Sequence, residues 1–356
     1  MKTRERASAL AEAASSFPFL SPTCVDDLLA LVAAELGNAE ALDRFVGHGA
    51  HLARAFSPAL TLHVVAGNTP AAALQSLVRG LLLGGTHVMK LPSGGMREVS
   101  DFLARLPLEL RKAVRVTEEL DATWLDEAEA LIVFGSDETV AHFRALARSG
   151  QRFVAHGHKV SFGAVFKDPE FASIEDAARD VCAFDQMGCL SPVVFYVGGD
   201  AREYGARLAQ AMAEGEAREP RGSVSPSIAN AIRALREETA FRAANGEACA
   251  VWQSEGSTAW TVLYDEAAGF PHSPLHRTIF VKPLPPDFAA ELADVSEHLS
   301  CAGIFPATEE HAARLGPLGL GRICPIGRMQ LPPWTWHQDG AGTLAPLVRW
   351  VDFEAR

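Results

Sequence analysis

The sequence lacks any apolar run long enough to cross a membrane. The longest runs, such as Leu81 to Leu83 and Leu131 to Phe134, fall far short of the ~20 residues that a spanning helix needs. Positive charge is also scarce, because 44 acidic residues against 32 lysines and arginines leave a net charge of −12. This excludes a global positive field for nucleic acid or anionic lipid and leaves only a local basic patch for a phosphorylated ligand. The N-terminal residues show no cleavable signal pattern, so we expect a cytoplasmic protein.

Several common motifs are absent as well. The six cysteines form no C-x-x-C and no Cys/His cluster with zinc spacing, and we expect no metal site. There is no G-x-S-x-G nucleophile segment and no G-x-x-x-x-G-K phosphate loop. We therefore expect thiols in a reducing compartment, and all of them except Cys189 are interpreted as small apolar residues of the core.

The length of 356 residues suits two domains of roughly 150 residues each. Residues 1–56 are expected to be helical, on the apolar pattern of residues 26–36. From about residue 60 strands and helices alternate, which predicts a parallel doubly wound α/β sheet. The predicted strands are 60–66, 87–91, 114–116, 130–134 and 153–154, and the predicted helices are 71–83, 103–114 and 138–148.

Beyond residue 157 the alternation continues less clearly and predicts a second α/β domain. The predicted helices are 174–182, 201–215 and 228–244, and the predicted strands are 193–197, 248–253, 260–264, 278–281 and 322–326.

Three segments follow predicted strands, where α/β sheets bind ligands: Gly67-Asn68-Thr69-Pro70, Lys90-Leu91-Pro92-Ser93-Gly94-Gly95 and Phe134-Gly135-Ser136-Asp137-Glu138-Thr139. The Asn68 amide can face a developing oxyanion, Lys90 suits a ribose or phosphate, and the amides after Gly135 can receive a pyrophosphate. The simpler interpretations, a turn, a solvated lysine and a helix cap, stay open at this point.

A fourth segment, 184–192, contains the candidate nucleophile Cys189. Gly188 leaves the backbone closely approachable, and the amide of Cys189 itself can donate to an oxyanion. Thiolates are strong nucleophiles and good leaving groups, which suits thioester chemistry. The competing thiol, Cys182, has the surroundings of a helix interior, and we expect it in the core.

The order of these segments resembles the aldehyde dehydrogenase superfamily and, more closely, the LuxC-type acyl-CoA reductases. The resemblance runs from about residue 60 to 350 and includes Gly157-His158-Lys159, Gln186-Met187-Gly188-Cys189, Ser273-Pro274-Leu275-His276-Arg277-Thr278, Arg322-Ile323-Cys324-Pro325-Ile326-Gly327 and Trp336-His337-Gln338-Asp339-Gly340. It implies an aldehyde dehydrogenase-like α/β fold with a Rossmann-type nicotinamide domain at 1–155, a catalytic α/β domain at 156–335 and a C-terminal tail at 336–356. That tail would pack back near the domain boundary, and the nicotinamide would face the thiol in the cleft between the domains.

Residue by residue, the resemblance implies that Cys189 attacks the acyl group while Asn68 and the Cys189 amide hold the oxyanion. Lys90 and Ser93 would contact the adenosine ribose, and Gly135 and Ser136 the pyrophosphate. The implied cofactor-binding residues are Thr69, Lys90, Ser93, Gly135 and Ser136.

Two positions depart from hydrolytic aldehyde dehydrogenases. Ala155 stands where those enzymes carry a water-activating glutamate, so an acyl-Cys would resist hydrolysis and pass to a thiol or a hydride. Ser93 stands where an acidic residue often grips the adenosine 2′-hydroxyl, which permits NADPH and mildly favours it over NADH. The chain is also shorter than typical LuxC proteins, which leaves the acyl-chain length and a homo-oligomer open.

The prediction is therefore NAD(P)H-dependent reduction of an acyl thioester, delivered as acyl-CoA or on an acyl-carrier protein, to the aldehyde through acyl-Cys189. Two alternatives remain: an oxidising NAD(P)-dependent aldehyde dehydrogenase, and a cysteine acyltransferase or thioesterase with a vestigial nucleotide fold. The roles of four further residues stay open between the site and simple packing: His156, His158, His337 and Asp339.

Overall fold

The computed structural model describes residues 1–67 and 69–354, which group into two compact units. The first unit combines residues 1–158 with the chain from residue 331 onward, and the second contains residues 159–330. Within the described residues, no helix is both long enough and apolar enough to span a bilayer.

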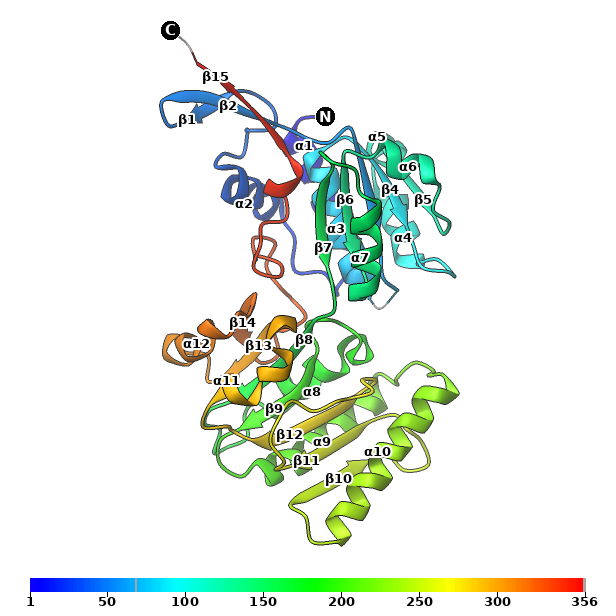
Figure 1. Ribbon diagram of the computed structural model, residues 1–356, viewed down its shortest axis with the longest axis vertical. Coiled ribbons are helices and arrows are strands. Elements are labelled where there is room, and N and C mark those ends of the chain that lie inside the picture. Colours follow the sequence, from blue (N-terminus) through cyan, green and yellow to red (C-terminus); the bar gives the residue numbers. More distant parts are fainter. Residues whose placement is uncertain (68, 355–356) are drawn as a thin grey trace. The chain divides into compact units, whose positions relative to one another are not determined.

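The first unit is built on a parallel five-stranded sheet with the order β5-β4-β3-β6-β7 (Figure 1). Its strands are β3 (Leu60–Val64), β4 (Thr86–Lys90), β5 (Val114–Thr117), β6 (Ala130–Phe134) and β7 (Arg152–His156). Its helices are α1 (Thr3–Ala14), α2 (Val25–Leu36), α3 (Pro70–Leu83), α4 (Arg97–Arg105), α5 (Leu108–Lys112), α6 (Ala122–Glu127) and α7 (Asp137–Leu146). The strand order reverses between β3 and β6, which is the point where doubly wound sheets bind ligands.

Pro107 divides a segment that the sequence pattern predicts as one helix over 103–114. The structure has α4 and α5 instead, and Pro107 is the residue that precedes α5. Proline has no N–H to donate and disfavours helical dihedrals at the residue before it, and Leu106 is accordingly extended. The single-helix prediction was wrong for this reason.

The prediction that the chain is helical up to residue 56 is also wrong at its end. Residues 46–56 form β1 (Val46–His48) and β2 (His51–Phe56), which join β15 (Arg349–Phe353) in an antiparallel three-stranded sheet. Ala53 and Ala55 are buried at alternate positions of β2, the period of a strand. One partner of β2, the strand β15, lies almost 300 residues later in the chain, so no local pattern could indicate this sheet.

Glu35 fastens the C-terminal segment to α2. Its carboxylate accepts hydrogen bonds from the backbone amides of Thr343, Leu344 and Ala345 at 2.9, 2.6 and 2.9 Å. The short 3-10 helix η4 (Ala345–Leu347) follows, and the chain then enters β15.

The second unit contains a seven-stranded sheet with the order β10-β11-β12-β9-β8-β13-β14, in which only β10 runs antiparallel to its neighbour (Figure 1). Its strands are β8 (Val160–Val165), β9 (Pro192–Val197), β10 (Cys249–Gln253), β11 (Thr261–Asp265), β12 (Thr278–Pro283), β13 (Leu299–Phe305) and β14 (Arg322–Pro325). Its α-helices are α8 (Ile174–Cys182), α9 (Ala201–Arg218), α10 (Pro226–Ala244), α11 (Phe288–Glu291) and α12 (Glu309–Leu315), and its 3-10 helices are η1 (Ala183–Gln186), η2 (Ala293–His298) and η3 (Gly316–Leu318).

Apolar side chains cover both faces of this second sheet. One core cluster joins the strands to α8 and α9, and another joins them to α11 and α12. The sequence pattern predicts neither β8 nor β13, although both are almost completely buried. Their runs are interrupted by Ser161, Gly163 and Ser300, small residues that weaken a strand pattern.

Candidate active site

The predicted cofactor residues of the first unit gather at one edge of its sheet. Thr69 directly precedes α3 in the connection that follows β3, Lys90 ends β4, and Gly135 follows β6. Parallel strands place these three positions at their common carboxyl edge, beside the reversal between β3 and β6. Asn68, the predicted oxyanion donor, lies outside the described residues.

The turn after β4 is contacted by a carboxylate that the sequence pattern does not indicate, that of Glu118 after β5. Ser93 is exposed, and the amide of the next residue, Gly94, donates to Glu118 Oε2 at 3.0 Å. Glu118 reaches this turn because β4 and β5 are parallel neighbours, and Leu91 N–H still donates to the Thr117 carbonyl at 2.8 Å. A negative charge is therefore bonded to the residue next to Ser93, at a place where the sequence predicts none.

The turn after β6 is tightly closed. Ser136 precedes α7, and its hydroxyl accepts from the Thr139 amide at 3.3 Å. A Cβ on Gly135 would lie 2.7 Å from the Thr139 side chain, so only glycine fits here without a shift. Asp137 accepts from the His158 amide at 2.9 Å. By contrast, α3 begins without a side-chain cap and without an acidic residue in its first turn.

Cys189 lies on an exposed turn between η1 and β9 of the second unit. Its carbonyl accepts a hydrogen bond from Ser161 Oγ at 2.7 Å, and Ser161 in turn accepts from the Cys301 amide at 3.1 Å. Two residues beyond Cys189, the Ser191 hydroxyl accepts from Gln330 Nε2 at 2.9 Å. The backbone on which the thiol sits is thus fastened to β8 and to the chain after β14.

Two left-handed turns hold the start of this segment. Phe184, Asp185 and Gln186 have φ of 53, 52 and 64°, and a second run, Leu275 to Arg277, has φ of 62, 52 and 61°. Such backbone costs roughly 1–2 kcal/mol per non-glycine residue, so tertiary contacts must hold it. An ion pair joins the two turns, with 2.7 Å between Arg277 Nη2 and Asp185 Oδ1. The buried side-chain amide of Gln186 also exchanges two hydrogen bonds with the backbone of Thr278.

Arg277 is buried, and its charge is balanced on two sides. Besides Asp185, it pairs with Glu216 at 2.8 Å and donates to the Glu219 carbonyl at 2.9 Å. Removing one partner of such a buried pair leaves an uncompensated charge, which makes this contact structurally demanding. In the sequence Arg277 is part of the segment 273–278, and nothing near it in the chain indicates its partners.

Cys182, the competing thiol, packs half-buried against the core between α8 and α9. Burial raises the pKa of its thiol to about 11, so it is a thiol rather than a thiolate at neutral pH. All six cysteines, each within the described part of the chain, are outside any disulfide.

His156 and Asp339, whose roles the sequence leaves open, form a contact. His156 Nδ1 lies 2.6 Å from Asp339 Oδ2, and the imidazole stacks on Phe134 with 4.5 Å between ring centroids. Successive residues of a strand point to opposite faces, so this pair does not occupy the face of Ala155.

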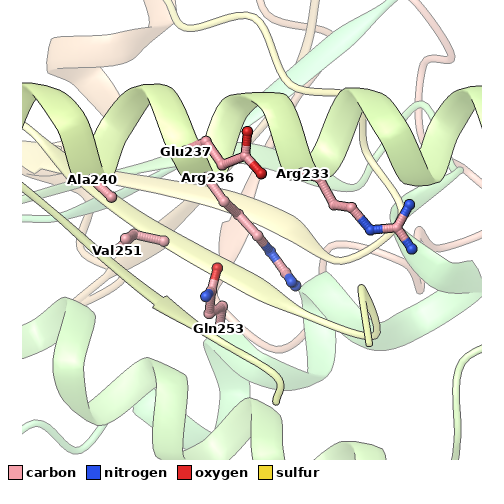
Figure 2. A pocket seen from close by; sticks show the side chains of 6 residues that line it. All are labelled: Arg233, Arg236, Glu237, Ala240, Val251 and Gln253. Atoms are coloured by element: carbon pink, nitrogen blue, oxygen red, sulfur yellow. The ribbon is translucent and has the colours of Figure 1, made fainter. Parts of the chain in front are cut away.

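The second unit also has an open pocket between α10 and β10, and Figure 2 shows the six side chains that line it: Arg233, Arg236, Glu237, Ala240, Val251 and Gln253. None of them is a predicted site residue. Arg236 donates to Thr261 Oγ1, to the Ser257 and Trp260 carbonyls and to Ser254 Oγ, and burial lowers its pKa to about 10. These contacts fasten α10 to the strand ends, which is a structural role.

Comparison with known proteins gives a consistent result. The family model described as "Acyl-CoA reductase (LuxC)" matches residues 7–350. A "Long-chain acyl-protein thioester reductase" of Aliivibrio fischeri is 24% identical over 345 residues, which is 90% of this chain and 69% of that protein. A "Long-chain acyl-protein thioester reductase 2" of Photobacterium leiognathi is 21% identical over 351 residues, with 91% and 70% covered.

Solved structures show the same fold at low sequence identity. A putative aldehyde dehydrogenase from Anabaena variabilis superposes with a TM-score of 0.65 at 14% identity, covering 99% of this chain and 87% of that one. Aldehyde dehydrogenase C from Pseudomonas syringae has a TM-score of 0.66 at 12% identity, with 99% and 84% covered. The expected aldehyde dehydrogenase-like α/β fold is confirmed.

Proposed function

Because the chain belongs to the LuxC family of acyl-CoA reductases, we propose that it reduces an acyl thioester to the aldehyde with a nicotinamide cofactor, through an acyl intermediate on Cys189. The family makes the chain an oxidoreductase that acts on acyl thioesters. The identity of the nucleophile, the cofactor residues and the substrate are the parts that we propose.

The observation that carries the proposal is the setting of Cys189. Its side chain is exposed, while the backbone around it is held by Ser161, Gln186 and Gln330. A nucleophile needs an accessible sulfur on a rigid backbone, because small displacements of a reacting atom are costly in rate. Cys182 is the poorer candidate, because its side chain is half-buried and burial raises its pKa.

In the first step the Cys189 sulfur bonds to the acyl carbon, and the carbon–sulfur bond of the substrate breaks. The leaving thiolate takes up a proton, and the acyl group is now a thioester of Cys189. A reduced nicotinamide bound by the first unit would supply the hydride that takes this acyl group to the aldehyde oxidation level. Release of the aldehyde then returns Cys189 as a thiolate, a good leaving group.

Ala155 supports reduction over the oxidising alternative. A side chain that activates water would discharge the acyl-Cys as the acid, and alanine cannot act as a base. The carboxylate of Asp339 is bound to His156 on the opposite face of β7. The intermediate is therefore preserved for the hydride.

The carboxyl edge of the first sheet fits a dinucleotide. We assign the pyrophosphate to the turns at Thr69, Gly135 and Ser136, where backbone can approach closely and helices α3 and α7 begin. Lys90 and Ser93 are assigned to the adenosine ribose. Ser93 and Lys90 permit the 2′-phosphate of NADPH, whereas the Glu118 carboxylate beside Gly94 disfavours it, so NADH also fits.

We propose that the acyl group arrives as a thioester of CoA or of a carrier protein. Both share the same reacting group, and the relatives from Aliivibrio fischeri and Photobacterium leiognathi are named for acyl-protein thioesters. The first experiment follows NADPH oxidation by absorbance with acyl-CoAs of increasing chain length, with NADH in parallel. We expect consumption that requires the acyl-CoA.

Two variants separate the nucleophile from a general effect of losing a thiol. Cys189→Ala should abolish turnover and retain cofactor binding, whereas Cys24→Ser, at the other exposed cysteine, should retain both. Turnover by Cys189→Ala would refute the assignment of the nucleophile. If the wild-type protein binds NADPH but does not oxidise it with any acyl-CoA, acyl-carrier substrates are the next to test. If it neither oxidises nor binds NADPH, the acyltransferase alternative is favoured.

A further inference from the structure

Two thiols of the second unit, Cys301 and Cys324, lie against each other. The sulfur atoms of Cys301 and Cys324 are 3.8 Å apart, on the neighbouring parallel strands β13 and β14. Cys301 is fully buried, while Cys324 is 7% exposed. In register Cys324 lies opposite Gly303, so the two cysteines are diagonal neighbours on one face of the sheet.

The surroundings make the two thiols unequal. The hydrogen bond between the two sulfur atoms lowers the pKa of Cys324 and raises the pKa of Cys301 well above its ordinary value, with burial adding to the rise. A guanidinium lies close, with Arg322 Nη1 4.0 Å from Cys301 Sγ. Cys324 is the less buried of the two thiols and has the lowered pKa, so we take it as the attacking cysteine.

We propose that Cys301 and Cys324 are an oxidation site, at which a peroxide closes a disulfide between β13 and β14. The Cys324 thiolate attacks one peroxide oxygen, the O–O bond breaks, and a sulfenic acid and one water form. The Cys301 sulfur then displaces the hydroxyl of the sulfenic acid, which leaves as a second water. Two thiols lose two electrons and two protons, and one peroxide is reduced to two waters.

The geometry allows the bond to close with a small movement. The sulfur atoms must approach from 3.8 Å to about 2.05 Å, and diagonal strand positions demand some backbone shift as well as side-chain rotation. β14 can supply this shift because it is a four-residue strand at the edge of the sheet, paired among the described strands with β13 on one side.

The site is joined by short hydrogen-bonded links to the turn of Cys189. The amide of Cys301 donates to Ser161, which donates to the Cys189 carbonyl, and Gln330 beyond β14 donates to Ser191. Closing the disulfide therefore acts on strands that also hold this turn. The proposal itself is independent of the reaction, because it concerns only the two thiols.

Peptide mapping tests it directly. Folded Cys189→Ser protein, which lacks the exposed thiol of the turn, is treated with hydrogen peroxide, alkylated under denaturing conditions and digested with trypsin. Cys301 and Cys324 fall in separate peptides, 278–314 and 323–328, because Lys282 precedes a proline and is not cleaved. We expect these two peptides to be linked after oxidation and separated again by dithiothreitol, with the same link in wild-type protein.

Variants define the pair. Cys324→Ser should lose the linked species, and Cys24→Ser should keep it. Recovery of both peptides as separate alkylated species from wild-type protein would overturn the proposal. Conversion of Cys324 to sulfinic acid without a link would also overturn it, because the second thiol would then be out of reach.

Discussion

The side-chain amide of Gln186 pairs with the backbone N–H and C=O of Thr278, in the way that two peptide units pair in a sheet. The Thr278 amide donates to Gln186 Oε1 at 2.7 Å, and Gln186 Nε2 donates to the Thr278 carbonyl at 3.0 Å. Gln186 Nε2 also donates to the Pro192 carbonyl at 2.8 Å, so one buried side chain ties both ends of the segment 186–192 to β12.

A Gln186→Leu substitution should loosen the turn of Cys189. It removes three hydrogen bonds to buried backbone groups, at about 0.5–1.5 kcal/mol for each lost bond. The Thr278 amide keeps its bond to the Leu275 carbonyl, and the Thr278 carbonyl keeps its bond from Ser273 Oγ. We expect a lower free energy of unfolding and a changed rate of Cys189 alkylation by iodoacetamide. Chemical denaturation and timed mass spectrometry measure the two effects separately.

Gln151→Leu is the matched control. Gln151 also donates to two backbone carbonyls, those of Leu125 and Ala128, but it lies in the first unit. This variant should lose stability and keep the wild-type rate of Cys189 alkylation. Equal alkylation rates in both variants would show that Gln186 contributes to stability alone.

The ion pairs of Arg277 should contribute far more than those at the surface. Arg277→Met leaves Asp185 and Glu216 without their buried cation, which should cost about 3–5 kcal/mol. Arg207→Met, which breaks an exposed pair with Glu203 on α9, should cost about 1 kcal/mol or less. Urea denaturation of both variants checks the difference, and similar losses would contradict it.

The sequence predicts those parts of the fold and site that depend on local pattern. The strands and turns around Lys90 and Gly135 could be predicted because a strand followed by a glycine turn and a helix lies within a few residues. Cys189 could be singled out from its own segment. The assignment of roles to these residues stays a prediction.

What the sequence could not predict depends on pairing over distance. Ser161 meets the Cys189 carbonyl across 28 residues, and Gln186 meets Thr278 across 92. Glu118 reaches the turn after Ser93 only because β4 and β5 are parallel neighbours. A serine in a buried strand or a glutamate after a short strand carries no signal by itself, since its partner is fixed by the order of strands.

Glu118 should influence the choice between the two nicotinamide cofactors. Its carboxylate beside Gly94 repels a 2′-phosphate bound near Ser93, so Glu118→Gln should raise the ratio of kcat/KM for NADPH over NADH. An exposed charge pair contributes up to about 1 kcal/mol, so the expected change is roughly two- to fivefold. Glu119→Gln, at the neighbouring exposed residue, should leave the ratio unchanged. An unchanged ratio in Glu118→Gln would place the 2′-phosphate elsewhere.

Two buried histidines should make the first unit sensitive to acid. His63 Nδ1 lies 2.8 Å from Ser76 Oγ, and His63 Nε2 lies 3.1 Å from His87 Nδ1. Gly80 makes room for the pair, because a Cβ there would lie 2.8 Å from the His87 ring. Burial lowers the pKa of His87 from 6.5 to about 4 and lowers the pKa of His63 well below its usual value.

The direction of the pH effect follows from proton binding. Between pH 6.5 and about 4 the unfolded chain protonates His87 while the folded chain keeps it neutral, so stability is complete above pH 6.5 and falls as the pH decreases. The loss amounts to about 3 kcal/mol from His87 alone, and His63 acts in the same direction. Urea denaturation at steps from pH 7 to pH 4 measures it.

A comparison of variants isolates this effect, because Asp180 acts in the opposite direction over the same window. Burial raises the pKa of Asp180 to about 7, so the folded chain gains stability from this group as the pH falls. A double variant, His63→Leu with His87→Leu, retains the Asp180 effect and should lose the acid sensitivity. His142→Leu, at an exposed histidine of α7, should follow the wild-type profile. If the double variant and wild type lose stability in parallel from pH 6.5 to 4, the buried histidines are not the cause, and the acid sensitivity lies in other groups of the unit.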